Sequence, residues 1–383
     1  MENEKKPRIL LLADYSNFHT TLAKGLRKLG CDVTVMSDGS SFMDTERDVD
    51  ITRRPGKLGG LLFLGRLYGP LHKKMRGYDV VSLRDPAFLD LKPERILPIF
   101  KRLVRENKAC YLSYISTDIP FLDMLEAKDS PLSYSEWFVD GRPNRLRVHD
   151  PQQWYGWHSP QMQRLNEGVY AGLRGAVTAL YEYHLSARRK FPEEKIAYGG
   201  IPIDVESITP VDFGVPRKVR IFLGRDYRRK LQKGSDLLEE AAKNVVARNP
   251  DKAELVILEN RPHKEYMEVM RSCHLLLDQI YSYTPATMAL EGMASGLTAV
   301  TGAEPEFYEF IGERENFPIV NAPIHLEGLE KCIEKVIQEP SALVENARRS
   351  RRFVETHHRM EVVAKRFLDF WMKDSLQAER KNE

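Results

Sequence analysis

The groups best suited to chemistry in this sequence are five cations in one short loop of the second half. The loop follows the apolar segment VRIFLG at 219–224 and carries Arg225, Arg228, Arg229, Lys230 and Lys233. Ser235 comes next and is a favourable N-cap for a helix. Fixed cations beside a helix N-terminus, where free N–H groups carry partial positive charge, suit a phosphate or a diphosphate. The alternative is a solvated basic loop next to an ordinary structural cap.

A second candidate anion site lies at Thr284-Pro285. Proline in the first turn of a helix loses no hydrogen bond, and a threonine just before it can cap the exposed N–H groups. We therefore predict that a helix begins at this dipeptide and offers its N-terminus to an anion.

Several common ligand motifs are missing from the sequence. No G-x-G-x-x-G follows the first predicted strand and no G-x-x-x-x-G-K-[ST] occurs, which argues against a dinucleotide cofactor and against a P-loop. The 4 cysteines form no C-x-x-C pair, so neither a disulfide scaffold nor a cysteine-based zinc site is expected. We expect no metal and no cofactor, and the scattered cysteines fit a reducing cytoplasm.

The elements that must position these residues alternate between strand and helix. In the first half we predict strands at 8–15, 31–37, 78–83 and 109–116, and helices at 18–30 and 93–107. An irregular stretch follows at 117–163, and a second alternating series begins at 219. This alternation predicts an α/β fold of two doubly wound domains. Because open parallel sheets bind ligands beyond the carboxyl ends of their strands, two facing sheets would share a ligand-binding cleft.

The length of 383 residues also suggests two domains. We place an N-terminal domain at 1–204, a linker at 205–218 and a C-terminal domain at 219–356. The linker lies where Pro210, Gly214 and Pro216 interrupt the periodic pattern.

Composition and charge limit the possible partners. The longest apolar run, at 58–65, is too short to cross a bilayer, and the apolar stretch near the N-terminus is too short for a signal peptide. A net charge of +3 without a nucleic-acid motif argues against a nucleic-acid partner. Residues 61–110, however, hold 11 Lys+Arg against 5 Asp+Glu among apolar side chains. This segment suits an anionic membrane surface or an anionic ligand, and the alternative is a solvated helix face.

Six sequence blocks together carry a family resemblance. In chain order they are AYGGIPID, IFLGR with KGSDLLEEA, EYMEVMRSCHLLLDQI, MALEGMASGLTAV, FPIVNAP and RRFVETHHRMEVVAKRFLDFW. Their order and spacing over 195–371 resemble glycosyltransferases of the GT-B fold, of the family 4 (group 1) type. The N-terminal half resembles the acceptor domain of bacterial members less closely. The resemblance implies two Rossmann-like domains and a last helix, at 357–376, that crosses back to the first domain.

The resemblance also implies roles for residues of the C-terminal half. Arg225 and Lys233 would grip the donor diphosphate, with Arg228 or Arg229 as a replacement for Arg225, and Glu291 would bind the ribose. Tyr283 stands where the family has a first glutamate, which normally touches the donor sugar or its phosphate. The remaining nucleotide-sugar contacts would come from Gly224, Thr284, Ala286 and Thr287.

In the N-terminal half, three polar residues follow predicted strands. Asn17 and His19 replace the glycine-rich loop of the family and are candidate contacts on the acceptor side of the cleft. A surface position on a helix is the alternative for His19. Asp118 is a candidate for a sugar hydroxyl or a proton transfer, and the alternative is a turn or helix cap before Pro120.

The function implied by the resemblance is transfer of a sugar from a UDP or GDP sugar to a saccharide or lipid-linked acceptor. Such an enzyme would retain the anomeric configuration, work without a metal, and build a surface polysaccharide or glycolipid from the cytoplasm, docked on the inner membrane face. One alternative is a degenerate GT-B protein that binds a nucleotide sugar or a partner without turnover, which Tyr283 favours. An epimerase or phosphorylase on the same fold is a further alternative.

Overall fold

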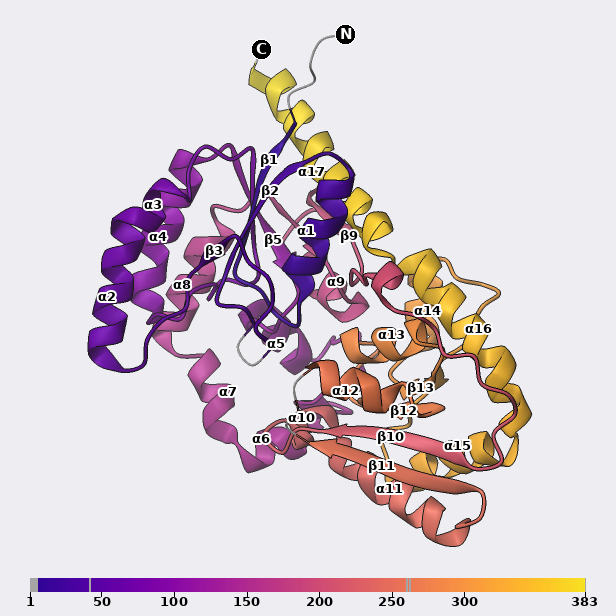
Figure 1. The fold of residues 1–383 in the computed structure, drawn as a ribbon. Coiled ribbons are helices and arrows are strands. Elements are labelled where there is room, and N and C mark those ends of the chain that lie inside the picture. Colours follow the sequence, from indigo (N-terminus) through magenta and orange to yellow (C-terminus); the bar gives the residue numbers. More distant parts are fainter. Residues whose placement is uncertain (1–5, 41–42, 260, 262, 383) are drawn as a thin grey trace. The chain divides into compact units, whose positions relative to one another are not determined.

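The computed structural model describes residues 6–40, 43–259, 261 and 263–382, which form two compact units with separate parallel sheets (Figure 1). Unit 1 comprises Met1–Met124, Gln152–Pro202 and Met360–Glu383, and unit 2 comprises Leu125–Pro151 and Ile203–Arg359. The predicted α/β class with two doubly wound domains is confirmed.

Unit 1 is built on a seven-stranded sheet in the order β3-β2-β1-β4-β5-β8-β9. The strands are β1 (Arg8–Leu12), β2 (Asp32–Ser37), β3 (Val49–Asp50), β4 (Val80–Leu83), β5 (Ala109–Tyr114), β8 (Gly175–Thr178) and β9 (Ile196–Tyr198). All neighbouring pairs are parallel. Every residue of β4, β5 and β8 is buried, as expected for a parallel sheet that is covered on both faces.

Helices cover both faces of this sheet. They are α1 (Phe18–Lys28), α2 (Gly56–Tyr68), α3 (Pro70–Lys73), α4 (Pro93–Glu106), α5 (Ile119–Glu126), α7 (Pro151–Trp157), α8 (Pro160–Tyr170), α9 (Tyr181–Arg188) and α17 (Met360–Asn382). Helices α1 and α17 lie side by side, and a Cβ on Gly25 would stand 2.5 Å from the Met360 carbonyl oxygen. Glycine therefore permits the contact that fastens the C-terminal helix to unit 1.

Unit 2 is built on a five-stranded parallel sheet in the order β11-β10-β12-β13-β14. The strands are β10 (Val219–Arg225), β11 (Ala253–Glu259), β12 (Leu275–Leu277), β13 (Thr298–Thr301) and β14 (Val320–Asn321). The helices are α10 (Lys230–Lys233), α11 (Ser235–Arg248), α12 (His263–Met270), α13 (Thr287–Ala294), α14 (Pro305–Ile311), α15 (Leu326–Gln338) and α16 (Pro340–His357).

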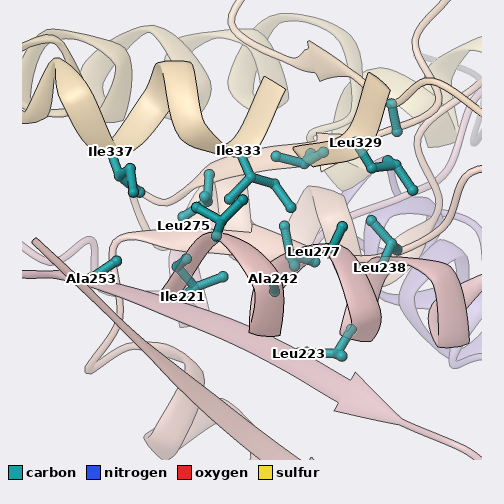
Figure 2. Close-up of a cluster of buried hydrophobic side chains, with 14 of the residues drawn as sticks. Ile221, Leu223, Leu238, Ala242, Ala253, Leu275, Leu277, Leu329, Ile333 and Ile337 are labelled. Carbon is teal, nitrogen blue, oxygen red and sulfur yellow. The ribbon is translucent and has the colours of Figure 1, made fainter. Parts of the chain in front are cut away.

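The core of unit 2 follows from the alternation of side chains along β10. Ile221 and Leu223 face α11 and α15, where they pack with Leu238 and Ile333 in one buried cluster (Figure 2). Phe222 points to the opposite face of the sheet and packs in a separate cluster. The two faces together hold the sheet rigidly between helices, so the loops at its carboxyl ends have a fixed base.

The segment Leu125–Pro151 departs from the predicted domain boundaries. We placed it within an N-terminal domain at 1–204, but it belongs to unit 2, where it forms β6 (Phe138–Val139), β7 (Arg142–Pro143) and α6 (Arg145–His149). Its Trp137 is 2% exposed and therefore needs a partner surface, which the sequence does not name.

The other boundaries move by a few residues. Unit 2 resumes at Ile203 instead of 205, and the chain returns to unit 1 at Met360 instead of 357. The predicted linker at 205–218 is held to unit 2, because Arg351 donates hydrogen bonds to the carbonyls of Val205 and Ile208.

Candidate functional site

The carboxyl edge of the unit 2 sheet brings the predicted diphosphate loop against the loop that follows β12. The loop runs from the end of β10 through α10 and closes at Gly234, which has a positive φ of 68°. A Cβ on Gly234 would stand 2.4 Å from the Ile280 side chain, and the Lys233 carbonyl accepts the Ile280 N–H at 3.0 Å. A glycine is required here both for the left-handed backbone and for the close approach.

Lys233 is fixed at this edge by an acidic residue that sequence reasoning missed. Its Nζ donates to Oδ1 of Asp278 at 2.8 Å, and the Asp278 side chain, just beyond β12, is 2% exposed. The second oxygen, Oδ2, is buried and has no hydrogen-bond partner among the residues that the structure describes. An acid directly after the apolar run HLLL was the signal that could have found it.

The positive charge of Arg225 is neutralised by two carboxylates, which lie on the side of β10 opposite to Asp278. Its guanidinium contacts Glu239 at 3.0 Å and Glu259 at 2.7 Å, and its Cζ lies 4.5 Å from the Tyr227 ring centroid. The hydrogen bond to Glu259 raises the pKa of Arg225. Because β10 lies between β11 and β12, Arg225 and Lys233 bind partners on opposite neighbouring strands. The sequence suggested one positive cluster, whereas both cations are ion-paired.

Lys230, an exposed cation of the loop, borders a surface pocket of about 320 Å³. Arg228 and Lys230 are exposed, and Arg229 donates to Gln232 at 3.2 Å. The pocket is lined by Arg225, Tyr227, Lys230, Ser235, Asp236, Glu239, Glu240, Lys243 and Asn244. Carboxylates and cations alternate along this lining, so it is not a simple anion pocket.

The predicted helix start at Thr284-Pro285 is wrong. Helix α13 begins at Thr287 with Ala286 as its N-cap, and Thr284 is buried. The Oγ of Ser282 binds the backbone N–H and C=O of Thr284, so a local side-chain bond replaces the helical turn. Ala286 and Thr287, both half-buried, do lie at the N-terminus of α13, and the N-cap residue Ala286 supplies no side-chain hydrogen bond there.

A half-buried tyrosine, Tyr266, lies beside three groups of this edge. A Cβ on Gly224 would stand 1.8 Å from Oη of Tyr266, so only glycine leaves room for this ring at the end of β10. Burial raises the pKa of Tyr266 well above its ordinary value, and the charges of Asp278 and Glu291 raise it further. Gly224 and Glu291, both predicted, therefore share one neighbourhood with Asp278 and Tyr266, which were not.

Tyr283 serves as an anchor for the segment Leu125–Pro151. Its ring stacks on Tyr134 with centroids 4.6 Å apart, and its hydroxyl accepts the Ser133 N–H at 2.9 Å. The Tyr134 hydroxyl in turn donates to Oε1 of Glu304 at 2.6 Å. Arg145 of the same segment pairs with Asp236 in the first turn of α11. The segment thus covers the loops after β12 and β13 at the carboxyl edge.

In unit 1, Asp118 lies inside the fold as the N-cap of α5. It accepts hydrogen bonds from the Phe121 N–H at 3.1 Å and from the hydroxyls of Tyr114 and Tyr170. Burial raises the pKa of Asp118 to about 6, although these hydrogen bonds oppose the shift. With 1% exposure this carboxylate has no face toward solvent, which agrees with the capping alternative and not with a direct substrate contact.

His19 is also inside unit 1 and not on its surface. One ring nitrogen contacts the Ala13 carbonyl and the other contacts Oγ of Ser113 at 2.9 Å, so the imidazole is held in place. Burial lowers the pKa of His19. Asn17 is half-buried with a positive φ of 63° and caps α1 without a side-chain hydrogen bond. Of the two predicted acceptor-side residues, only Asn17 has part of its surface open.

Sequence reasoning also missed a polar group that follows β4. Asp85 is 6% exposed and accepts hydrogen bonds at Oδ2 from Arg84 at 2.6 Å and from Ser116 at 3.1 Å. Its Oδ1 is buried and lacks a partner among the described residues. The Arg-Asp pair directly after the predicted strand at 78–83 was the available signal.

Solved structures share this architecture over nearly the whole chain. Anabaena HepE in complex with UDP-glucose superposes with a TM-score of 0.60 at 12% identity, covering 96% of this chain and 99% of that one. Sucrose-phosphate synthase from Thermosynechococcus elongatus gives 0.59 at 11%, with 96% and 99% covered. WaaG, a glycosyltransferase involved in lipopolysaccharide biosynthesis, gives 0.56 at 12%, with 94% and 98% covered. No curated protein matches the sequence.

The family comparison falls on unit 2 and α17. Residues 228–369 match the family model described as Glycosyl transferase-like. This segment is therefore similar to glycosyltransferases. The predicted GT-B fold, the resemblance to group 1 glycosyltransferases and the assignment to the glycosyltransferases are confirmed. The matched segment contains Lys233, Asp278 and Glu291, so the edge described above is a candidate donor site.

Proposed function

We propose that the protein transfers a sugar from a nucleoside diphosphate sugar, UDP or GDP, to a saccharide or lipid-linked acceptor. The observation that carries this proposal is the glycosyltransferase-like segment 228–369, in which Lys233, Glu291 and the N-terminus of α13 lie at the carboxyl edge of one sheet. The complex of HepE with UDP-glucose and the role of WaaG in lipopolysaccharide biosynthesis support the donor and the acceptor class.

The electrostatics of the site suit departure of a diphosphate. Cleaving the sugar–phosphate bond builds negative charge on the leaving group, and a fixed ammonium and helix N–H groups stabilise that charge without moving. Asp278 holds the Nζ of Lys233 in place, so the ammonium does not have to be ordered when the diphosphate binds. In this proposal no cofactor or metal takes part, the anomeric configuration is retained, and Glu291 binds the ribose. Arg225 assists from the far side of β10.

The acceptor side of the proposal concerns unit 1. We expect Asn17 to contact the acceptor and the basic segment 61–110 to dock the protein on the cytoplasmic face of an anionic membrane. None of the described helices is long and apolar enough to cross a bilayer.

A donor screen tests the proposed function. Nucleoside diphosphates and their glucose, N-acetylglucosamine, galactose and mannose conjugates are added singly, and the melting temperature and release of nucleotide are measured. We expect one nucleotide series to raise the melting temperature, and its sugar conjugate to be hydrolysed slowly without acceptor. Stabilisation without hydrolysis or transfer to any membrane extract would support the non-catalytic alternative, which Tyr283 favours. No stabilisation by any conjugate would contradict both.

A further inference from the structure

Helix α2 exposes an apolar face that no described residue covers. Leu58, Leu61 and Leu62 are 69%, 66% and 54% exposed, and their spacing puts them on one side of the helix. Phe63 and Leu67, on the other side, are buried in unit 1. A surface helix normally shows polar residues to water, so three neighbouring exposed leucines mark a binding face.

The sequence segment that carries this face is basic. Residues 51–78 contain seven Lys+Arg and no Asp or Glu. Five of these cations are exposed and make no ion pair with a described residue, namely Arg54, Lys57, Lys73, Lys74 and Arg76. The other two have partners, because Arg53 pairs with Asp90 and Arg66 donates to backbone carbonyls. The rest of the chain carries the compensating negative charge.

An aromatic residue lies at the end of the same helix. Tyr68 is 45% exposed, and the guanidinium of Arg102 on α4 lies 4.6 Å from its ring centroid. Tyrosines and long cationic side chains favour the boundary between lipid headgroups and acyl chains. Leucines flanked by cations and a tyrosine are the composition that binds the surface of an anionic bilayer without crossing it.

We propose that α2 and α3 form a docking surface for an anionic lipid bilayer, with Leu58, Leu61 and Leu62 in the acyl region and the exposed cations at the headgroups. This assignment rests on the proposed function for its purpose, which is to bring the donor site to a lipid-linked acceptor. It shifts the docking surface from the predicted basic segment 61–110 to residues 54–76. Residues 51–78 contain no Asp or Glu. A segment with cations alone suits a uniformly anionic lipid surface better than a protein partner, whose surface would carry both positive and negative charges.

Co-sedimentation with vesicles tests this surface. The purified protein is mixed with vesicles of phosphatidylglycerol and phosphatidylcholine, or of phosphatidylcholine alone. We expect binding to the anionic vesicles only, reduced at least about tenfold in the double variant L61S/L62S and in K73Q/K74Q. Leu29→Ser is the matched control, since Leu29 is also an exposed leucine of unit 1.

Two results would overturn the docking proposal. The first is equal vesicle binding by wild type and L61S/L62S, and the second is no binding of wild type to anionic vesicles. Self-association through α2, seen as a dimer that L61S/L62S dissolves, would also overturn it. Nucleotide-sugar binding is measured without vesicles, so failure of the donor proposal leaves this measurement unaffected.

A second, independent observation concerns the place of the missing family glutamate. Tyr283 cannot supply a carboxylate, and its hydroxyl is engaged by Ser133. The residue directly beside it is Glu304, whose N–H donates to the Tyr283 carbonyl at 3.1 Å. Glu304 follows β13 at the carboxyl edge and caps the start of α14.

The Glu304 carboxylate is ordered and partly available. It is half-buried, and its Oε1 accepts the Tyr134 hydroxyl at 2.6 Å. No hydrogen bond or ion pair from a described residue reaches its Oε2. A carboxylate with one oxygen fixed and the other open is suited to accept a hydrogen bond from a sugar hydroxyl.

We infer that Glu304, held by Tyr134, binds a hydroxyl of the donor sugar in place of the glutamate that Tyr283 replaces. This assignment also rests on the proposed function. It predicts that a substitution at Glu304 lowers the affinity for the nucleotide sugar and leaves the affinity for the free nucleotide unchanged. The Tyr134 hydroxyl acts as a positioning group, because it sets the direction of the open oxygen.

Parallel affinity measurements test the role of Glu304. The dissociation constants of the free nucleotide and of the nucleotide sugar identified by the donor screen are compared. We expect Glu304→Gln to weaken binding of the nucleotide sugar about 10- to 100-fold and Tyr134→Phe to weaken it less. The affinity for the free nucleotide should be unchanged in both variants. Glu309→Gln, an exposed glutamate of the same helix, is the control.

Equal weakening of both ligands by Glu304→Gln would show a structural role and overturn the inference. Affinities equal to those of the control would overturn it as well. If wild type binds the free nucleotide but no nucleotide sugar, the inference fails together with the proposed donor. If it binds the nucleotide sugar normally, only the assignment of Glu304 is at stake.

Discussion

The carboxyl edges of the two sheets use polar residues in different ways. In unit 2, Lys233 and Arg225 are about one-fifth exposed and are held by carboxylates from neighbouring strands. In unit 1, Asp118 and His19 are almost fully buried and their hydrogen bonds go to the chain itself. A polar residue at the end of a strand is therefore functional or structural according to how much of it remains open, which the sequence position does not show.

The largest effect is expected at Lys233 in the edge that stays open. Lys233→Ala removes the fixed ammonium and leaves the buried Asp278 without its partner. We expect the turnover rate in the transfer or hydrolysis assay to fall by about 10²–10³, which corresponds to about 2.7–4 kcal/mol. Lys331→Ala is the control, because Lys331 also pairs with a carboxylate, Glu327, but is 74% exposed and lies on α15. A loss of activity in both variants alike would remove the distinction between the two lysines.

The sequence predicted the elements of these edges better than the contacts of their residues. Apolar strands such as 219–224 and a helix at Ser235 are local patterns, and both occur where expected. The predicted cap is wrong, however, because Gly234 is the N-cap and Ser235 is the first residue of α11. The partners of the cations lie far along the chain, since Arg225 binds Glu259 and Lys233 binds Asp278. Charges that are distant in sequence pair only after the parallel strands align, so counting cations in one loop overstated its positive charge.

Two further predictions from the sequence were wrong or incomplete for physical reasons. The cap at Thr284 was predicted from its residue type, but Ser282 competes for the same backbone groups two residues earlier. The aromatic segment Leu125–Pro151 indicated burial, yet its partners, Tyr283 and Glu304, lie about 150 residues further along the chain. Neither competition nor long-range partnership leaves a pattern that a single sequence reveals.

An intermediate effect is expected at Asp118 in the closed edge, and it concerns stability. Burial raises the pKa of Asp118 from 3.8 to about 6 in the folded protein, so the folded state binds the proton more tightly than the unfolded chain. Stability contributed by this group therefore falls as pH rises from about 4 to about 6 and is constant above, by about 3 kcal/mol in total. Denaturant titrations from pH 4 to 7 should show this loss in wild type and not in Asp118→Asn.

Activity separates the two roles of Asp118. Asparagine still caps a helix, so the variant should retain most of the wild-type turnover rate at neutral pH. A folded Asp118→Asn variant that turned over about a hundredfold more slowly would instead support a catalytic role for Asp118, because loss of a proton-transfer group has an effect of this size.

The smallest effect is expected at Asn17, the one predicted residue of unit 1 that remains partly open. Its φ of 63° suits asparagine and glycine, so Asn17→Gly should leave the free energy of unfolding within about 0.5 kcal/mol, whereas Asn17→Val should lower it by about 1–2 kcal/mol. If the amide contacts the acceptor, both variants raise the acceptor KM to a similar extent despite their different stabilities. A KM that follows stability instead would place Asn17 with Asp118 and His19 among the residues that serve only the fold.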